Sequence, residues 1–358
     1  MSLKARLEAL IALNGPMSTA DYMELCLHHP DFGYYATRPR LGGAGGDFIT
    51  APLVSQMFGE LIGLWAVETW DRLGRPAPFR LVEVGPGDGT LMQDALRAAR
   101  LVPEFIAAAD LWLVEPSPPL AACQRDRLEG AAPTPKWAAS LDAVPGGAPL
   151  ILVANEVLDC LPARQFVRLD DGWAERRVGV DAGSRLYFGL APVPAGFAPP
   201  AGLEASAGAL VEISTAQEGF AHALGAQVVA DGGAALLIDY GRSAPEAGDT
   251  LQAIRDHVRE GPLDHPGEAD LTVHADFPAV AAAARAAGAE VTPTITQGEL
   301  LTRLGVEARA ASLSRARPDR AERIAREVHR LTADDQMGQL FKAVAIHSPG
   351  LSVPGFDA

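Results

Sequence analysis

From residue 79 onward, short and almost continuously apolar runs alternate with longer amphipathic stretches. Apolar runs separated by helical segments are typical of strands buried on both faces of a parallel sheet. The pattern therefore predicts an α/β fold with a mostly parallel sheet. The expected strands are "FRLVEVG" (79–85), "LWLVEPS" (111–117), "APLILVANE" (148–156), "GAALLIDYG" (233–241) and "GQLFKAVAIHS" (338–348), and the expected helices include "GTLMQDALRAAR" (89–100) and "PPLAACQRDRLEG" (118–130).

Two segments depart from this rhythm. Residues 1–75 are predicted to form an N-terminal helical cap, broken by a glycine-rich stretch that would act as a lid. Residues 76–358 would form the main domain, with an insertion at about 163–230. The insertion opens with the strand-like runs "RQFVRL", "WAERRVGV" and "RLYFGL", which predict an antiparallel lobe.

The helix expected over 55–74 has a plausible start and stop, since Ser55 is a good N-cap and Gly74 a good terminator. Its apolar side chains at helical spacing are expected to be core, and they include Met57, Leu61, Leu64 and Trp65.

The charge balance narrows the classes of function. The chain has 30 Lys and Arg against 45 Asp and Glu, a formal charge of −15 over 358 residues. Because attraction to phosphate supplies much of the affinity for nucleic acid, no nucleic-acid partner is expected. The charge would attract a cationic ligand or a basic protein segment, although acidity that only maintains solubility is the plainer explanation.

Neither a membrane span nor a disulfide or metal framework is expected. No run of about 18 apolar residues occurs, and the N-terminal stretch is amphipathic, so we expect a cytoplasmic chain without membrane insertion, signal peptide or transit peptide. The cysteines Cys26, Cys123 and Cys160 are odd in number and widely spaced, which predicts reduced thiols. No residue cluster suggests a metal site.

The stretch "LVEVGPGDGTL" indicates a ligand site. Gly85, Gly87 and Gly89 lie between a strand and a helix, where glycine permits positive φ and the helix offers free N–H groups. A dinucleotide turn would read G-x-G-x-x-G, but Thr90 stands where its third glycine would be. The spacing G-x-G-x-G after Glu83 is the turn of class I methyltransferases, which bind S-adenosylmethionine by its amino-acid end and ribose.

The next expected strand supplies the second half of such a site. Glu115 ends the apolar run "LWLV", and a carboxylate there can accept hydrogen bonds from both ribose hydroxyls. A purely structural glycine turn is the alternative. The cofactor-binding residues expected from these two motifs are Glu83, Gly85, Gly87, Gly89, Thr90 and Glu115.

A third group of polar residues is "ANEVLD", which follows the strand "PLILV". Ligands in open α/β sheets lie beyond the carboxyl ends of the strands, so Asn155, Glu156 and Asp159 are expected to face the transferred methyl group. Two carboxylates there suit a guanidinium, which a carboxylate binds bidentately. Alternatively, Asn155 caps a helix and the acids face water.

Six motifs in order resemble the MidA family of S-adenosylmethionine-dependent methyltransferases. They are "GYYATRPRLGGAGGDFITAPLVSQMFGELIG", "LVEVGPGDGTLMQD", "ANEVLDCLPARQF", "LLIDYG", "ADLTVHADF" and "MGQLFKAVA", and the resemblance extends from about Met17 to Ile346. It implies a class I methyltransferase fold: Rossmann-like, with a mostly parallel seven-strand sheet, the N-terminal helical cap and the inserted antiparallel lobe. Mitochondrial members of the family are protein arginine methyltransferases that help to assemble respiratory complex I.

The motif "GDFITAP" is expected to close over the cofactor and exclude water, because the preceding "GGAGG" is flexible. Asp47 and Thr50 are its polar groups available for the cofactor. The chain departs from the family's usual residues at Val157 and Leu158, where most members carry two aromatic residues. Another departure is "APL", where most carry "SPE".

The overall prediction is a methyltransferase that modifies an arginine of a partner protein, with Glu156, Asp159 and Asn155 as catalytic residues and S-adenosyl-L-methionine as cofactor. An assembly or scaffold factor that binds the cofactor without turnover stays an alternative. So does a small-molecule methyltransferase. Neither the substrate protein nor homo-oligomer formation follows from the sequence.

Overall fold

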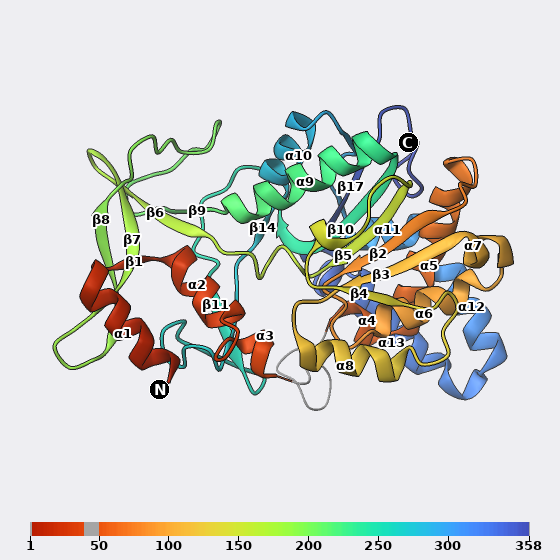
Figure 1. Cartoon of the computed structure of the whole chain (residues 1–358), viewed down its shortest axis with the longest axis horizontal. Helices are drawn as coiled ribbons and strands as arrows, with labels where there is room; N and C mark the ends of the chain where they lie inside the picture. Colours follow the sequence, from red (N-terminus) through yellow and green to blue (C-terminus); the bar gives the residue numbers. More distant parts are fainter. Residues whose placement is uncertain (1, 39–49, 358) are drawn as a thin grey trace. The chain divides into compact units, whose positions relative to one another are not determined.

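The computed structural model describes residues 2–38 and 50–357, and these form two compact units (Figure 1). One unit comprises the described parts of Met1–Arg38, Leu158–Gly219 and Arg242–Ala279, and we call it the lobe. The other comprises the described parts of Pro39–Val157, Phe220–Gly241 and Val280–Ala358, and we call it the core unit.

The core unit is built on one sheet with the strand order β15-β17-β10-β5-β2-β3-β4, and β16 also pairs with β17. Strands β10, β5, β2, β3 and β4 run parallel, whereas β17 is antiparallel to β10, β15 and β16. The mostly parallel sheet expected from the apolar runs is confirmed. Its strands are β2 (Phe79–Val84), β3 (Ala109–Val114), β4 (Lys136–Ala138), β5 (Leu150–Asn155), β10 (Gly233–Arg242), β15 (Glu290–Val291), β16 (Ile295–Thr296) and β17 (Phe341–His347).

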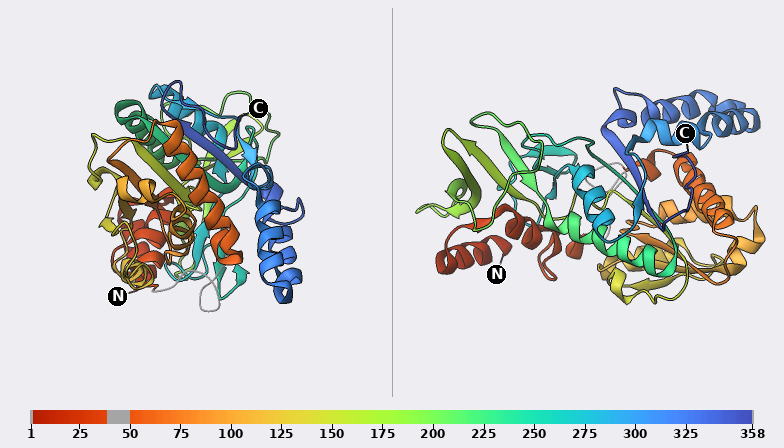
Figure 2. Two further views of the ribbon diagram at one scale, coloured as in Figure 1. Left: turned by 90° about the vertical axis from the view of Figure 1, so that its right-hand side faces the viewer. Right: turned by 90° about the horizontal axis from the view of Figure 1, so that it is seen from above.

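Helices connect these strands and bury their apolar sides against the sheet. One hydrophobic core cluster joins side chains of α5 and α6 to β2, β3, β5 and β17, with Trp65, Phe79 and Phe105 among its buried members. Figure 2 shows α12 and α13 as a blue pair of neighbouring helices. The helices are α4 (Ala51–Val54), α5 (Gln56–Arg72), α6 (Thr90–Ala99), α7 (Pro103–Ala108), α8 (Pro118–Arg127), α9 (Thr215–Asp231), α10 (Phe277–Ala286), α11 (Gln297–Arg303), α12 (Val306–Ala316), α13 (Ala321–Thr332) and α14 (Met337–Leu340).

Helix α5 begins as its sequence predicts, because the Ser55 side chain accepts a hydrogen bond from the Met57 N–H. Met57, Leu61 and Trp65 are buried as expected, but Leu64 is 39% exposed. The expectation for Leu64 was wrong because the buried face is centred on Phe58 and Trp65, and Leu64 lies off that face at 100° per residue. None of the helices in the described ranges is long and apolar enough to cross a membrane.

The lobe contains the antiparallel sheet that the insertion predicted. Its order is β1-β7-β6-β9. Strand β8 pairs with β7 on the edge opposite β6 (Figure 1). A second sheet has the order β12-β11-β13. The elements are α1 (Leu3–Asn14), β1 (Met17–Ser18), α2 (Thr19–His28), α3 (Tyr34–Thr37), β6 (Arg164–Leu169), β7 (Gly172–Val180), β8 (Leu186–Pro192), β9 (Leu210–Ile213), β11 (Gln252–Arg255), β12 (Val258–Glu260), β13 (Asp270–Thr272) and β14 (Ala275–Asp276).

The division into units differs from the expected boundaries at 75 and at about 163–230. The first 38 residues belong with the insertion, because Met17 and Ser18 pair with β7 and Tyr22 Oη donates to Pro262 O at 2.8 Å. Helix α5 belongs instead to the core unit, where it packs against α6. Apolar side chains of α5 complete the core of the sheet, which is why the boundary does not fall after this helix.

Candidate functional site

The glycine turn follows β2 at the carboxyl edge of the parallel sheet. Gly85, Gly87 and Gly89 all have positive φ, at 63°, 55° and 83°, a region that L side chains rarely adopt. A Cβ on Gly85 would lie 2.8 Å from Val157 Cγ2, so packing also requires glycine there. A Cβ on Gly87 would meet no atom of the described residues within 4 Å, so these residues leave open space above this peptide.

The residue between the second and third glycines closes the turn. Asp88 Oδ1 accepts a hydrogen bond from the Thr90 N–H at 3.0 Å, at the start of α6. Arg127 binds Asp88 twice, with its Nη2 2.7 Å from Oδ2 and its Nε 2.7 Å from the carbonyl oxygen. The turn is therefore preformed by contacts within the core unit.

Glu115 lies one residue beyond the end of β3 and is buried, with 8% of its surface exposed. Its Oε1 accepts from the Ser117 N–H at 2.8 Å, and its Oε2 accepts from Gln124 Nε2 at 3.0 Å. Burial raises the pKa of Glu115 to about 7, and these two donors oppose the rise. The carboxylate is thus both buried and oriented.

Sequence reasoning missed Gln124, Arg127 and Asp88 as members of this assembly. Gln124 and Arg127 stand three residues apart, on one face of the helix that follows the Glu115 strand. That spacing was a usable signal, because a helix after the second strand of such a site packs beside the turn.

Glu83 is buried inside the same assembly, near the end of β2. Its pKa is raised to about 8, mainly by burial and also by the nearby charges of Asp88 and Glu115. Its Oε2 has no hydrogen-bond partner among the described residues. A buried carboxyl of this kind is stabilised by an added cationic group.

These residues fit S-adenosylmethionine. Glu83 Oε2 and the buried Oγ1 of Thr90, which also lacks a hydrogen-bond partner in the described part of the chain, are acceptors for a polar ligand. Glu115 is an oriented carboxylate suited to hydroxyl donors. The open space at Gly87 leaves room for a ligand to approach the backbone.

Asn155 is the last residue of β5, the strand next to β2, and Glu156 follows it. Glu156 has φ of 55°, which is uncommon for a residue other than glycine and is found mostly where surrounding contacts fix it. Its Oε1 accepts from Asn155 Nδ2 at 3.0 Å and from the Ala51 N–H at 3.2 Å. The Oδ1 of Asn155 is buried and lacks a partner among the described residues. The alternative that Asn155 caps a helix is wrong, because bends and turns follow it.

The loop that carries Asp159 begins the next segment of the lobe, and the division between the two units falls between Val157 and Leu158. Asp159 is buried, with 6% of its surface exposed. Carbonyl groups along residues 158–163 are bonded by groups from several elements. These contacts are Gln217 Nε2 to Leu158 O (2.8 Å), Val273 N to Asp159 O (2.9 Å), His28 Nε2 to Cys160 O (3.3 Å), Ser214 Oγ to Pro162 O (2.7 Å) and Thr19 Oγ1 to Ala163 O (2.8 Å).

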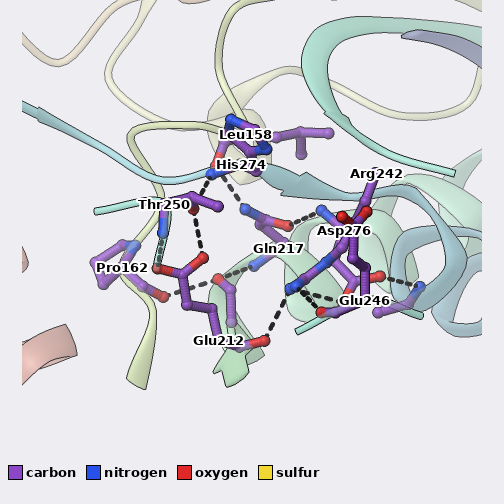
Figure 3. A network of polar contacts seen from close by, with 11 residues as sticks. Leu158, Pro162, Glu212, Gln217, Arg242, Glu246, Thr250, His274 and Asp276 are labelled. Carbon is purple, nitrogen blue, oxygen red and sulfur yellow. Dashed lines mark hydrogen bonds and ion pairs between the residues drawn. The ribbon is translucent and has the colours of Figure 1, made fainter. Parts of the chain in front are cut away.

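Figure 3 shows a polar network that includes Leu158 and Pro162 of this loop. Glu212 lies at its centre with 1% of its surface exposed, and it accepts from the Thr250 N–H and Leu251 N–H at 3.1 Å each and from the Thr250 hydroxyl. Arg242 Nη2 bonds the Glu212 carbonyl at 2.9 Å and pairs with Asp276 at 3.1 Å. Gln217 links the network to the loop, since its Oε1 accepts from the Asp276 N–H while its Nε2 holds Leu158. The loop is therefore tied to this network through Gln217, although the buried Nε of Arg242 has no hydrogen-bond partner among the described residues.

Asp47 and Thr50 are the other two residues predicted to bind the cofactor. Asp47 lies outside the described residues, as do most residues of the expected lid. Thr50 precedes α4 in an extended conformation, and its carbonyl accepts from the N–H groups of Leu53 and Val54. Across 2–38 and 50–357, no group of three or more His, Cys, Asp or Glu residues is arranged to hold a metal ion.

Comparison with known proteins identifies the class. The model of a family of S-adenosyl-L-methionine-dependent methyltransferases matches residues 61–295. The chain is 35% identical to a mitochondrial protein arginine methyltransferase NDUFAF7 homolog of Drosophila melanogaster, over 99% of this chain and 87% of that one. It is 31% identical to the mitochondrial protein arginine methyltransferase NDUFAF7 of Danio rerio, over 96% and 86%.

A solved structure agrees with these relationships. A protein from Burkholderia thailandensis bound to S-adenosyl-homocysteine superposes with a TM-score of 0.86 at 29% identity, over 99% of this chain and 92% of that one. The fold and the matching relatives define an S-adenosylmethionine-dependent methyltransferase of class I. Within that class, the chain belongs to the MidA family. Its cofactor is S-adenosyl-L-methionine.

The buried carboxyl of Glu83 predicts a specific pH dependence of stability. Between its ordinary pKa of 4.5 and the value of about 8 in the fold, the folded chain keeps a proton that the unfolded chain has lost. Unfolding releases that proton, so the free energy of unfolding should fall as pH rises from about 5 to 8, by on the order of 1 kcal/mol per pH unit from this group. Glu83→Gln should remove this contribution.

Urea unfolding of the ligand-free protein across that pH window checks the prediction. The matched control is Glu104→Gln, which changes an exposed glutamate of α7 in the same unit. The difference in free energy of unfolding between wild type and Glu83→Gln should change with pH. The variant should gain stability relative to wild type as the pH rises. A gap that stays constant from about pH 5 to 8 would contradict a raised pKa at Glu83.

Proposed function

We propose that the cofactor lies over the turn from Gly85 to Gly89, with its amino group toward Glu83 and its ribose hydroxyls on Glu115. S-adenosylmethionine supplies a methyl group carried on a positively charged sulfur. The protein residues bind and orient it: Glu83 accepts from a cation, and Glu115 accepts from hydroxyls. The buried oxygen of Glu83 and the open space at Gly87 support this assignment, as does Thr90 Oγ1.

We further propose that the acceptor is an arginine side chain of a partner protein, in agreement with the activity named for relatives at 31–35% identity. The observation that carries the proposal is the fixed carboxylate of Glu156 at the end of β5. Two N–H donors orient its Oε1, and its backbone is held at φ of 55°. A guanidinium offers a planar fork of N–H donors, for which an oriented carboxylate is the usual partner.

An arginine is protonated at any working pH, so its nitrogen is a poor nucleophile. Glu156 is proposed to hold the guanidinium plane and to stabilise the charge that moves away from the attacking nitrogen. Asn155 supports this role by donating to Glu156 Oε1. Asp159, three residues later in the chain, is proposed as a further carboxylate for the acceptor, on a loop whose carbonyls are bonded by the lobe.

The two alternative functions are a scaffold factor and a small-molecule methyltransferase. A scaffold that binds the cofactor without turnover has no need of the Asn155–Glu156 pair, so substitution of Glu156 separates the two ideas. A small-molecule methyltransferase would use the same cofactor residues, and the identity of the labelled product separates that idea. The net charge of −15 favours a basic acceptor.

Gly87→Ala should weaken cofactor binding at least tenfold. No atom of residues 2–38 or 50–357 would lie within 4 Å of a Cβ on Gly87, so we expect a methyl group there to displace the cofactor. The positive φ adds a stability loss of about 1 kcal/mol. Gly74→Ala is the matched control, because Gly74 also has positive φ and open space but precedes β2, at the opposite end of the strand. Calorimetry with S-adenosylhomocysteine should detect weaker binding in Gly87→Ala alone. Equal affinity in both variants would contradict the proposal that the cofactor binds at this turn.

Glu156→Gln should lower methyl transfer by about two to three orders of magnitude, because it removes one partner of the developing charge. Cofactor affinity should change little, since Glu156 is assigned to the acceptor. The measurement is single turnover with methyl-labelled cofactor and an extract of cells lacking this enzyme. Asp159→Asn should act in the same direction.

Glu322→Gln serves as the control, because the Glu322 side chain on α13 is 95% exposed. Mass spectrometry locates the label. Arginine labelling that depends on Glu156 agrees with the proposal, whereas label on lysine, a carboxyl group or a small molecule refutes an arginine acceptor. Full labelling by Glu156→Gln would leave the reaction standing and refute the assigned residue.

A further inference from the structure

The side-chain amide of Gln124 lies between the two halves of the proposed cofactor site. Its Nε2 donates to the Gly87 carbonyl oxygen at 2.9 Å and to Glu115 Oε2 at 3.0 Å. The side chain is fully buried, at 0% exposure. One NH₂ group therefore bonds both the glycine turn and the carboxylate on the neighbouring strand.

Trp137 fixes which way this amide points. Its indole Nε1 donates to Gln124 Oε1 at 2.9 Å. An indole N–H can only donate, so it selects the orientation in which the amide oxygen faces β4 and the NH₂ group faces the turn. The guanidinium of Arg125 lies 4.8 Å from the centre of the Trp137 ring and packs over the indole.

The elements explain why a single side chain can reach both groups. The Gly87 turn follows β2, Glu115 follows β3, and Trp137 lies on β4, which are three adjacent parallel strands. Helix α8 begins beside Glu115, where Ser117 caps it, and carries Gln124 two turns later. Gln124 thus ties the carboxyl ends of β2 and β3 together.

We propose that Gln124 is a positioning residue for the cofactor, which holds the Glu115 carboxylate and the Gly87 peptide in a fixed relation before the cofactor binds. This inference rests on the cofactor site proposed above. Ser117 and Gln124 each occupy one oxygen of Glu115, so they set the plane of the carboxylate and the direction of its remaining lone pairs. Without Gln124, that carboxylate would have to be ordered at the expense of binding energy.

The contact also has an electrostatic consequence. Burial raises the pKa of Glu115, and the Gln124 hydrogen bond opposes that rise. Removing the amide should push the pKa of Glu115 higher, so that the ionised acceptor forms only at higher pH. A side chain that only filled space would have no such effect.

The experiment uses Gln124→Met, which keeps the length of the side chain and removes its polar end. S-adenosylhomocysteine binding, measured by calorimetry from about pH 6 to 9, should weaken about tenfold or more near pH 7, the usual cost of losing a hydrogen bond to a charged group. The rise of affinity with pH should move to higher pH. Gln339→Met, at an exposed glutamine of α14 in the same unit, is the matched control and should bind like wild type.

A double-mutant cycle with Glu115→Ala separates positioning from packing. If Gln124 acts through Glu115, Gln124→Met should cost little further affinity in the Glu115→Ala background. Wild-type affinity in Gln124→Met would overturn the inference. So would an equal loss in both backgrounds without any shift of the pH profile. If Glu115→Ala itself binds like wild type, the proposed cofactor site fails and this inference fails with it.

Trp137→Phe provides a second test that leaves Gln124 in place. It removes the indole donor that orients the amide while retaining an aromatic ring. A smaller loss of affinity, with a pH shift in the same direction, is expected. If Gln124→Met does not fold, unchanged affinity and an unchanged pH profile in Trp137→Phe overturn the inference.

Discussion

The burial of two carboxyl groups at the ends of adjacent strands constrains the rest of the site. Glu83 on β2 pairs in register with Leu113 of β3, and Glu115 follows Leu113 by two residues, just past the end of β3. Both groups have raised pKa values, about 8 for Glu83 and about 7 for Glu115, because burial disfavours their charged forms. The hydrogen bonds from Ser117 and Gln124 offset part of the rise in the pKa of Glu115. Glu83 retains an oxygen without a partner among the described residues, which a bound cation would satisfy.

The lobe supplies the hydrogen bonds that hold an irregular loop in place. Residues 158–163 have no regular ladder of their own, and their carbonyls are bonded by groups from both the N-terminal helices and the insertion. Gln217 connects this loop to the buried Glu212 and Arg242 network (Figure 3). An N-terminal segment distant in sequence thus belongs structurally to the insertion, because it supplies some of these donors.

Much of the core unit could be predicted from the sequence because it depends on local signals. Continuous apolar runs predict strands buried on both faces, and glycine spacing predicts positive φ. Contacts that depend on which face a helix presents gave weaker signals, which is why Gln124 and Arg127 on α8 were missed. The strands β11, β12 and β13 could not be predicted, because strands of three or four residues are too short to display a periodic pattern. Leu64 shows that apolar spacing alone does not identify which face of a helix is buried.

The central claim is that the cofactor compensates for the buried acids of the turn. The number of protons exchanged on binding tests it most directly. Calorimetry of S-adenosylmethionine binding at pH 7, repeated in buffers of different ionisation enthalpy, gives that number. Because the pKa of Glu83 in the free protein is about 8, a cationic partner should drive off a proton, so wild type should release a substantial fraction of one proton. Glu83→Gln should release clearly less. Binding with no net proton release, or equal release by Glu83→Gln, would contradict the account.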